Sequence, residues 1–99
     1  MKVHFTETAS EQLDGIYAYI ANDSPRYAQR VIDQITRKAN MIGVMPLAAG
    51  IVPEYGRQDV REVFLYQYRI IYRILSDQID VVAVIHGARL LPERFEDLE

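Results

Sequence analysis

The stretch VREVFLYQYRIIYRILSDQIDVVAVI, residues 60–85, decides the fold. It is rich in β-branched and aromatic residues and is interrupted only at 66–67 and 76–78, which predicts strands at 60–65, 68–75 and 79–85. Such short interruptions favour an antiparallel meander. The last segment is apolar at every position from 81 to 85. This indicates an interior strand that is covered on both faces.

The middle strand presents two different faces. Its even positions, Tyr68 to Ile74, are apolar or aromatic and predict a core against helices. Its odd positions include Arg69 and Arg73, which point the same way and lie about 13 Å apart. We expect an exposed cationic strip there, suited to a phosphate backbone or an acidic helix. The alternative is internal pairing with nearby acids, namely Glu62, Asp80 or Glu93.

The residues before this stretch predict a short strand and a helical hairpin. Val3 to Phe5 is the strand, and Thr8 to Glu11 has the pattern of a helix capping box. A second helix is expected from Ser24-Pro25 to a cap at Gly43. Residues 45–59 are expected to form an extended loop. Together these elements predict one α+β domain over residues 1–99, in which a helical hairpin packs on a curved antiparallel sheet of four strands.

The C-terminal residues carry more apolar side chains than an exposed tail without contacts would need. We expect them either to cover the odd face of the sheet or to await a partner; they are Leu90, Leu91, Phe95 and Leu98.

Composition and motifs exclude several classes of function. The 99 residues carry a net charge of −3 and no cysteine, which excludes disulfides, thiolate metal sites and a cysteine nucleophile. Neither a transmembrane run nor a signal peptide is recognised, and a cytoplasmic location fits. No phosphate-binding glycine loop or nucleophile elbow occurs, and the two histidines lack metal-ligand spacing. We therefore expect neither a metal nor a cofactor.

Charge is unevenly distributed along the chain. Residues 26–73 hold eight basic and four acidic residues, whereas both ends are acidic. Arginine and tyrosine are the residues that dominate binding hot spots. The candidate binding residues are therefore drawn from the sheet and the turn that follows it; they are Arg61, Tyr68, Arg69, Arg73, His86 and Arg89.

Several of these segments resemble the RelE/ParE superfamily of small toxins from bacterial type II toxin–antitoxin systems. The resemblance is carried by Ser24-Pro25, by Arg61-Glu62-Val63, by the stretch from Tyr68 to Ile74 and by Ile85-His86-Gly87-Ala88-Arg89. It implies one of two activities. RelE-like members cut messenger RNA on the ribosome, and ParE-like members poison DNA gyrase.

For the RNase activity the resemblance would place Arg69 and Arg89 on phosphate-stabilising arginines, in a site that works without metal. Two features depart from that pattern. Glu62 stands where lysines are usual, and Phe95 is the only aromatic residue after His86. The acidic charge also differs from that of a protein that docks on ribosomal RNA. These departures favour the ParE-like branch, in which no catalytic residue is assigned.

The resemblance also implies a cognate antitoxin whose C-terminal part is disordered alone, so that the toxin forms a hetero-oligomer with it. Exposed residues of the helical hairpin, such as Tyr19, Tyr27 and Met41, would suit such a partner. A degenerate toxin that only binds its antitoxin is the third alternative.

Overall fold

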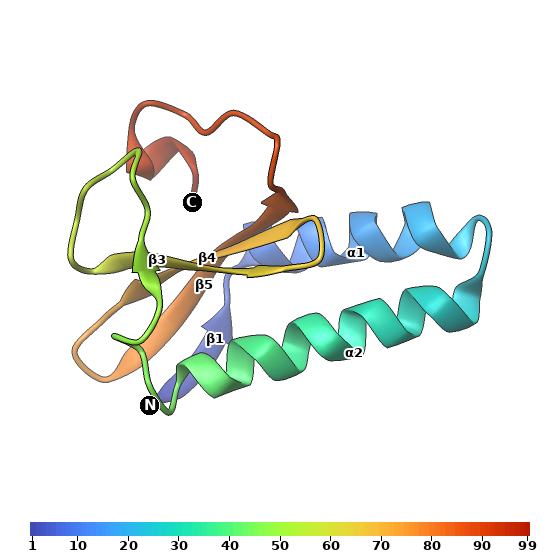
Figure 1. Ribbon diagram of the computed structural model, residues 1–99, viewed down its shortest axis with the longest axis horizontal. Helices are drawn as coiled ribbons and strands as arrows, with labels where there is room; N and C mark the ends of the chain where they lie inside the picture. Colours follow the sequence, from blue (N-terminus) through green and yellow to red (C-terminus); the bar gives the residue numbers. More distant parts are fainter.

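A computed structural model describes residues 1–99 (Figure 1). Strand β1 and two helices come first, and four strands and a short 3₁₀ helix follow. Their bounds are β1 Lys2–Phe5, α1 Glu7–Ala21, α2 Pro25–Ile42, β2 Gly50–Ile51, β3 Val60–Leu65, β4 Tyr68–Ile74, β5 Gln78–His86 and η1 Phe95–Asp97.

One open sheet contains all five strands in the order β1-β5-β4-β3-β2. The predicted α+β class and the antiparallel meander β3-β4-β5 are confirmed. The sheet differs from the expected one in two respects. Gly50 and Ile51, expected to lie in a loop, form a fifth strand against β3, and β1 pairs with β5 in parallel.

The parallel pairing of β1 follows from its side chains. Val3 lies opposite Ile79 and Phe5 opposite Val81. In this register the side chains of Val3 and Phe5 both pack against the core beneath the helices. Burial of apolar area therefore determines the position of a four-residue strand that local sequence could not orient.

Caps define both helices. The hydroxyl of Thr6 accepts a hydrogen bond from the Ala9 amide at 3.2 Å, so the expected capping box at Thr8 is wrong by two residues. The Thr6 amide itself donates a hydrogen bond to the carbonyl of Val81 in β5. This bond keeps the backbone extended just before the helix. Ser24 caps α2 with Pro25 in its first turn, as predicted. Neither helix combines the length and apolar character needed to cross a membrane.

The end of α2 requires glycine for steric reasons. A Cβ atom at Gly43 would lie 2.3 Å from the carbonyl oxygen of Met1. The predicted cap at this position is therefore confirmed, and the close approach to the start of β1 explains why no larger residue fits.

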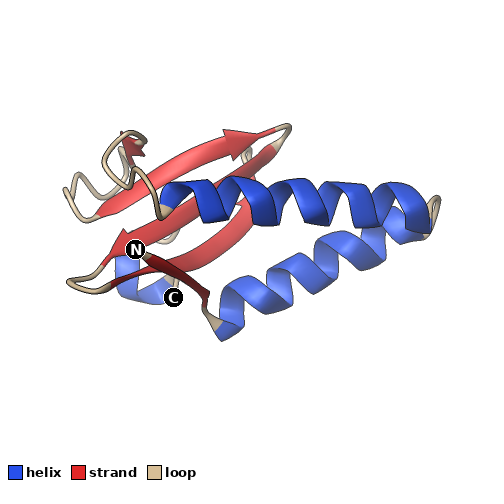
Figure 2. Ribbon diagram, turned by 90° about the horizontal axis from the view of Figure 1, so that it is seen from below, coloured by secondary structure: helices blue, strands red, loops and turns tan.

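The sheet separates two cores. Both helices lie on one face, where they pack on Tyr68, Ile70 and Tyr72 of β4 (Figure 2). The C-terminal segment covers the other face, where Phe95 and Leu98 pack against Ile71. A bulge in β5 opposite Ile71 and Tyr72 turns two consecutive residues, Val82 and Ala83, toward this second core.

Candidate functional site

Arg69 lies at the centre of an ion-pair cluster on the face that the C-terminal segment covers. Its Nε donates to Glu62 Oε1 at 2.6 Å. Its two terminal nitrogens donate to the two oxygens of Glu54, at 2.9 and 2.7 Å. The arginine is only 6% exposed. The expectation of an exposed guanidinium is therefore wrong for Arg69, and the alternative of pairing with Glu62 is confirmed.

Electrostatics reinforce this cluster. The hydrogen bond from Arg69 holds the pKa of Glu54 below its usual value, and the same bond raises the pKa of Arg69. Both shifts favour the charged forms. Arg69 is therefore held as a cation paired with the carboxylate of Glu54.

Arg73 is the second arginine of the expected strip, and it too faces the chain's own acids. Its Nε lies 3.5 Å from Asp59 Oδ2, and its Nη1 lies 3.8 Å from Glu99 Oε1. Its guanidinium also stands over the ring of Phe95, 6.0 Å from the centroid. Arg73 keeps partial exposure, and Phe95 and Glu99 of the C-terminal segment lie beside its guanidinium.

The same segment is anchored at several points. Tyr55 packs edge-on against Phe95 and donates its hydroxyl to the Pro92 carbonyl at 2.8 Å. The guanidinium of Arg57 stacks on the ring of Phe95, 4.8 Å from its centroid. The same guanidinium donates hydrogen bonds to both carboxylate oxygens of Asp59. Of the two roles expected for the tail, covering the odd face is the one found for Phe95 and Leu98.

Arg61 has a structural role at the edge of the sheet. Its guanidinium donates to the carbonyl of Gln58 at 3.0 Å, to that of Ala49 at 2.9 Å and to that of Leu47 at 3.3 Å. These bonds hold the segment before β2 against β3. Arg61 lies apart from Arg69 and is engaged with its own backbone.

The remaining three candidates come together. Tyr68, His86 and Arg89 line one shallow hollow between α1 and the ends of β4 and β5, together with Gln12, Tyr19 and Gln67. No carboxylate lines this hollow, and Arg89 is exposed without an ion-pair partner. His86 is exposed, and its Nδ1 accepts a hydrogen bond from the Ala88 amide. Tyr68 is buried, and burial raises the pKa of its phenol.

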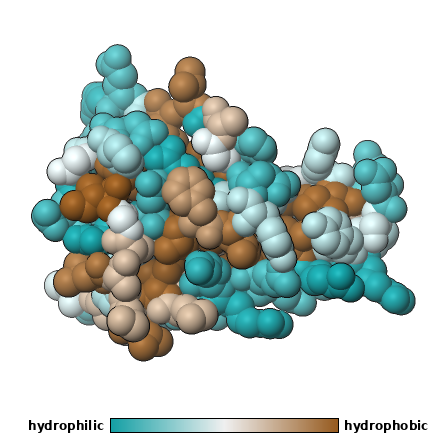
Figure 3. All heavy atoms as spheres, viewed as in Figure 1, coloured by the Kyte–Doolittle hydropathy of each residue, from teal (hydrophilic) through white to brown (hydrophobic).

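An apolar groove lies on the helix side of the molecule, beside the sheet edge. Its lining includes Met41, Met45, Ala49, Val63 and Tyr72. Brown and tan side chains gather at the lower left of Figure 3, over the end of α2 and the loop that follows it. β2 pairs only with Arg61 and Glu62, so the outer edge of β3 beyond Glu62 has no strand partner. The sequence drew attention to Met41 alone, because the groove forms between segments that are distant along the chain.

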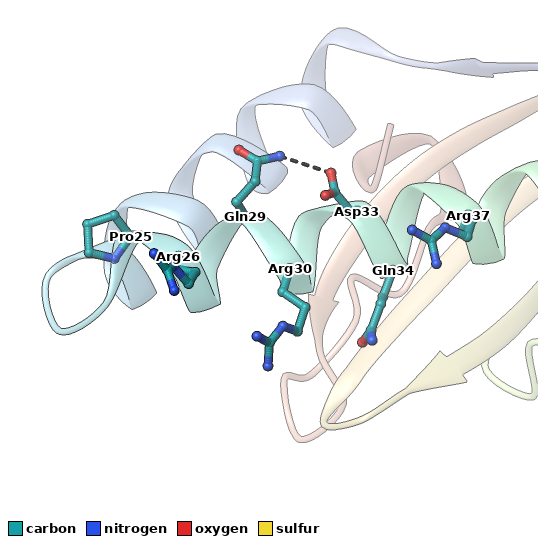
Figure 4. A pocket seen from close by; sticks show the side chains of 7 residues that line it. All are labelled: Pro25, Arg26, Gln29, Arg30, Asp33, Gln34 and Arg37. Atoms are coloured by element: carbon teal, nitrogen blue, oxygen red, sulfur yellow. Dashed lines mark hydrogen bonds between the residues drawn. The ribbon is translucent and has the colours of Figure 1, made fainter.

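A polar hollow over α2 was missed altogether. It is lined by Arg26, Arg30 and Arg37 with Gln29, Asp33 and Gln34, and by no apolar residue except Pro25 at its end (Figure 4). The helical spacing of these arginines is present in the sequence, but the predicted binding residues lay only on the strands and the turn after them. No three His, Asp or Glu side chains lie together as a metal ion would require.

Comparison with known proteins places this geometry in context. A family model described as "ParE toxin of type II toxin-antitoxin system, parDE" matches residues 3–91. A solved structure described as "Chromosomal ParDE TA system from P. aeruginosa" superposes with a TM-score of 0.71. It is 22% identical, and the alignment covers 87% of this chain and 95% of that chain. At this identity the likeness shows a shared fold. Comparison with curated protein sequences gave no match.

Proposed function

The chain belongs to the ParE toxin family of type II toxin–antitoxin systems, and on that premise we propose that it inhibits DNA gyrase by protein–protein contact and is neutralised by a cognate antitoxin. The observation that supports this mechanism is that Arg69 is already paired with acids of its own chain. An arginine that stabilises a cleaved phosphate must reach that phosphate. Arg69 already donates from all three of its nitrogens to Glu54 and Glu62 and is largely buried.

Breaking this cluster to admit a substrate would be costly. Removal of one partner from a buried ion pair typically costs several kcal/mol, because the other charge is left without compensation. A messenger RNA would have to replace the two carboxylates that bind Arg69. The geometry therefore favours action through contact over cleavage of RNA.

His86 and Arg89 are the accessible members of the expected binding set, and we assign them to the contact with the target. They lie at the end of β5 in a hollow without carboxylates. An arginine in such a place is free to form a charge-assisted pair with an acid of a partner protein. Arg61, Arg69 and Arg73 instead hold the scaffold together.

The antitoxin is assigned to the apolar groove and the adjoining edge of β3. An extended segment can add to a free strand edge through backbone hydrogen bonds, while its side chains enter neighbouring pockets. The free edge beyond Glu62 lies next to a groove lined by Met41, Met45 and Val63. Methionine side chains adapt readily to a binding partner.

Controlled expression of the chain alone tests this function, with DNA damage and message cleavage measured separately. Growth arrest with a DNA-damage response and intact messages is expected. Message cleavage without DNA damage would establish the RelE-like alternative, and undisturbed growth would indicate a degenerate toxin.

Co-expression with the antitoxin tests the groove. Met45→Glu places a charge in the groove and is expected to leave toxicity intact while it weakens neutralisation at least tenfold. Leu90→Glu is the matched control, because Leu90 is 91% exposed and lies outside the groove. Equal neutralisation of both variants would rule out this surface for the antitoxin.

A further inference from the structure

The outward face of α2 carries a line of unpaired arginines. At 3.6 residues per turn, Arg26, Arg30 and Arg37 fall within about 40° of one another around the helix. They lie opposite the residues that α2 buries, Ala28, Val31, Ile35 and Ala39. The line extends about 16 Å along the helix axis. All three side chains are exposed, and none forms a salt bridge or a hydrogen bond within the chain.

This arrangement differs from an ordinary solvated helix face. Arg26 and Arg30 are an i, i+4 pair of like charge, which destabilises a helix slightly. Asp33 is spaced to pair with Arg37 one turn later, but its carboxylate accepts a hydrogen bond from Gln29 Nε2 at 2.9 Å instead. In Figure 4 Gln29 and Asp33 point to one side of α2, and Arg30 and Gln34 to the other. Asp33 forms no salt bridge with the arginines, so its charge offsets only one of their three, and the face keeps a net charge of +2.

Gln34 adds a further donor to the line. Its Oε1 accepts a hydrogen bond from the hydroxyl of Tyr66, in the turn between β3 and β4. The amide nitrogen of Gln34 is therefore left to donate to a ligand. Arginine and glutamine side chains are the usual donors to phosphate oxygens of nucleic acids.

We propose that this face, Arg26, Arg30, Gln34 and Arg37, binds the phosphate backbone of duplex DNA. Its chemistry distinguishes duplex DNA from the other polyanions. An acidic peptide would need an apolar anchor for a stable contact, and the three arginines are surrounded by polar side chains. Single-stranded nucleic acid would need an aromatic platform for its bases. No aromatic residue lines the hollow itself, and the adjoining Tyr66 is engaged through its hydroxyl with Gln34.

Binding through three phosphates is weak by itself. Sequence-independent binding of this kind has a dissociation constant of about 10⁻⁴–10⁻⁶ M, and the net charge of −3 places this chain at the weak end. A weak contact gains effect when a second interaction holds the toxin near DNA. The arginine face would then raise the affinity of the toxin for a target protein that is already bound to DNA.

Fluorescence anisotropy of a labelled DNA duplex, titrated with the full-length protein in the absence of gyrase, tests the proposal. Three phosphate contacts predict that raising the salt from about 50 to about 200 mM weakens binding about 40-fold. Arg30→Gln/Arg37→Gln leaves one contact and is expected to reduce this loss to about 3.5-fold. Glutamine preserves the helix, because its helix propensity is close to that of arginine.

A charge-matched control separates the arginine face from the overall charge. Lys2→Gln/Arg94→Gln removes the same two charges from exposed positions elsewhere and is expected to bind DNA like the unmodified protein. An equal loss in both double variants would overturn the proposal, as would the absence of salt-dependent binding. Tighter binding of polyglutamate or of single-stranded DNA than of the duplex would also overturn it. Because gyrase is absent, the result does not depend on the proposed target.

Discussion

Arg69 joins two acids that differ in their environment. Glu62 is 11% exposed and Glu54 is 41% exposed. A buried carboxylate depends on its partner far more than an exposed one does, because water cannot replace the lost hydrogen bond. The two acids are therefore expected to respond differently to substitution.

Arg69→Met is expected to lower the free energy of unfolding by about 3–5 kcal/mol, because it leaves Glu62 charged and buried without a partner. The double variant Arg69→Met/Glu62→Leu is expected to recover most of this loss. Urea denaturation measures both. Arg73→Met is the control on the same face, with an expected loss below about 1 kcal/mol, because Arg73 is partly exposed. Equal losses for Arg69→Met and Arg73→Met would contradict the buried cluster.

Acid is expected to destabilise the protein through Glu54. Its pKa in the folded state lies below the unfolded value near 4.5, because Arg69 hydrogen-bonds the carboxylate. Between the two pKa values the unfolded chain binds more protons, so stability rises with pH there. The stabilisation is complete above about pH 5 and is lost as the pH falls through the folded pKa.

Glu54→Gln should therefore flatten the pH dependence of the unfolding free energy below about pH 5. Glu93→Gln, at an exposed position that forms no salt bridge, should leave it unchanged. The same slope in both variants would show that Glu54 does not carry the effect.

The Arg69 cluster was only partly predictable from the sequence. Alternation along 68–75 correctly placed Arg69 and Arg73 on one face, and Glu62 was recognised as a possible partner. Glu54 was not, because it lies on an irregular segment 15 residues away whose path depends on the whole fold. Whether a charged face is open or covered is a tertiary property.

Elements with strong local patterns were predictable. The three strands of the meander and the Ser24 cap follow from residue types close together in the sequence. β2 was missed because two residues carry no readable period, and it forms only because β3 offers an edge. The direction of β1 was missed because it pairs with a strand more than 70 residues later. The apolar content of the tail did indicate a cover, without deciding what it covers.

The C-terminal cover is expected to contribute substantially to stability. Phe95 is buried between Tyr55, Arg57 and the sheet, so Phe95→Ala should lower the unfolding free energy by about 3–5 kcal/mol. Leu90→Ala, at an exposed position of the same segment, should change it by less than about 0.5 kcal/mol. Thermal or urea denaturation compares the two. A loss below about 1 kcal/mol for Phe95→Ala would mean that the segment is only loosely held.

The molecule as a whole places its cations in three different settings. Those of the covered sheet face are neutralised by the chain's own acids, and Arg61 binds backbone carbonyls. Arg89 beside the β5 end and the arginine face of α2 remain available to partners. The basic middle of the sequence, residues 26–73, thus divides into arginines that are paired within the sheet region and arginines on α2 that have no partner in the chain.

The most direct measurement is of plasmid supercoiling and cleavage by purified gyrase in the presence of this protein. We expect supercoiling to be inhibited and linear, cleaved DNA to accumulate. Arg89→Ala should weaken the effect at least tenfold, whereas Arg94→Ala, at another exposed arginine, should not. Gyrase that remains fully active at excess protein, while translated messages are cut in a parallel ribosome assay, would contradict this function.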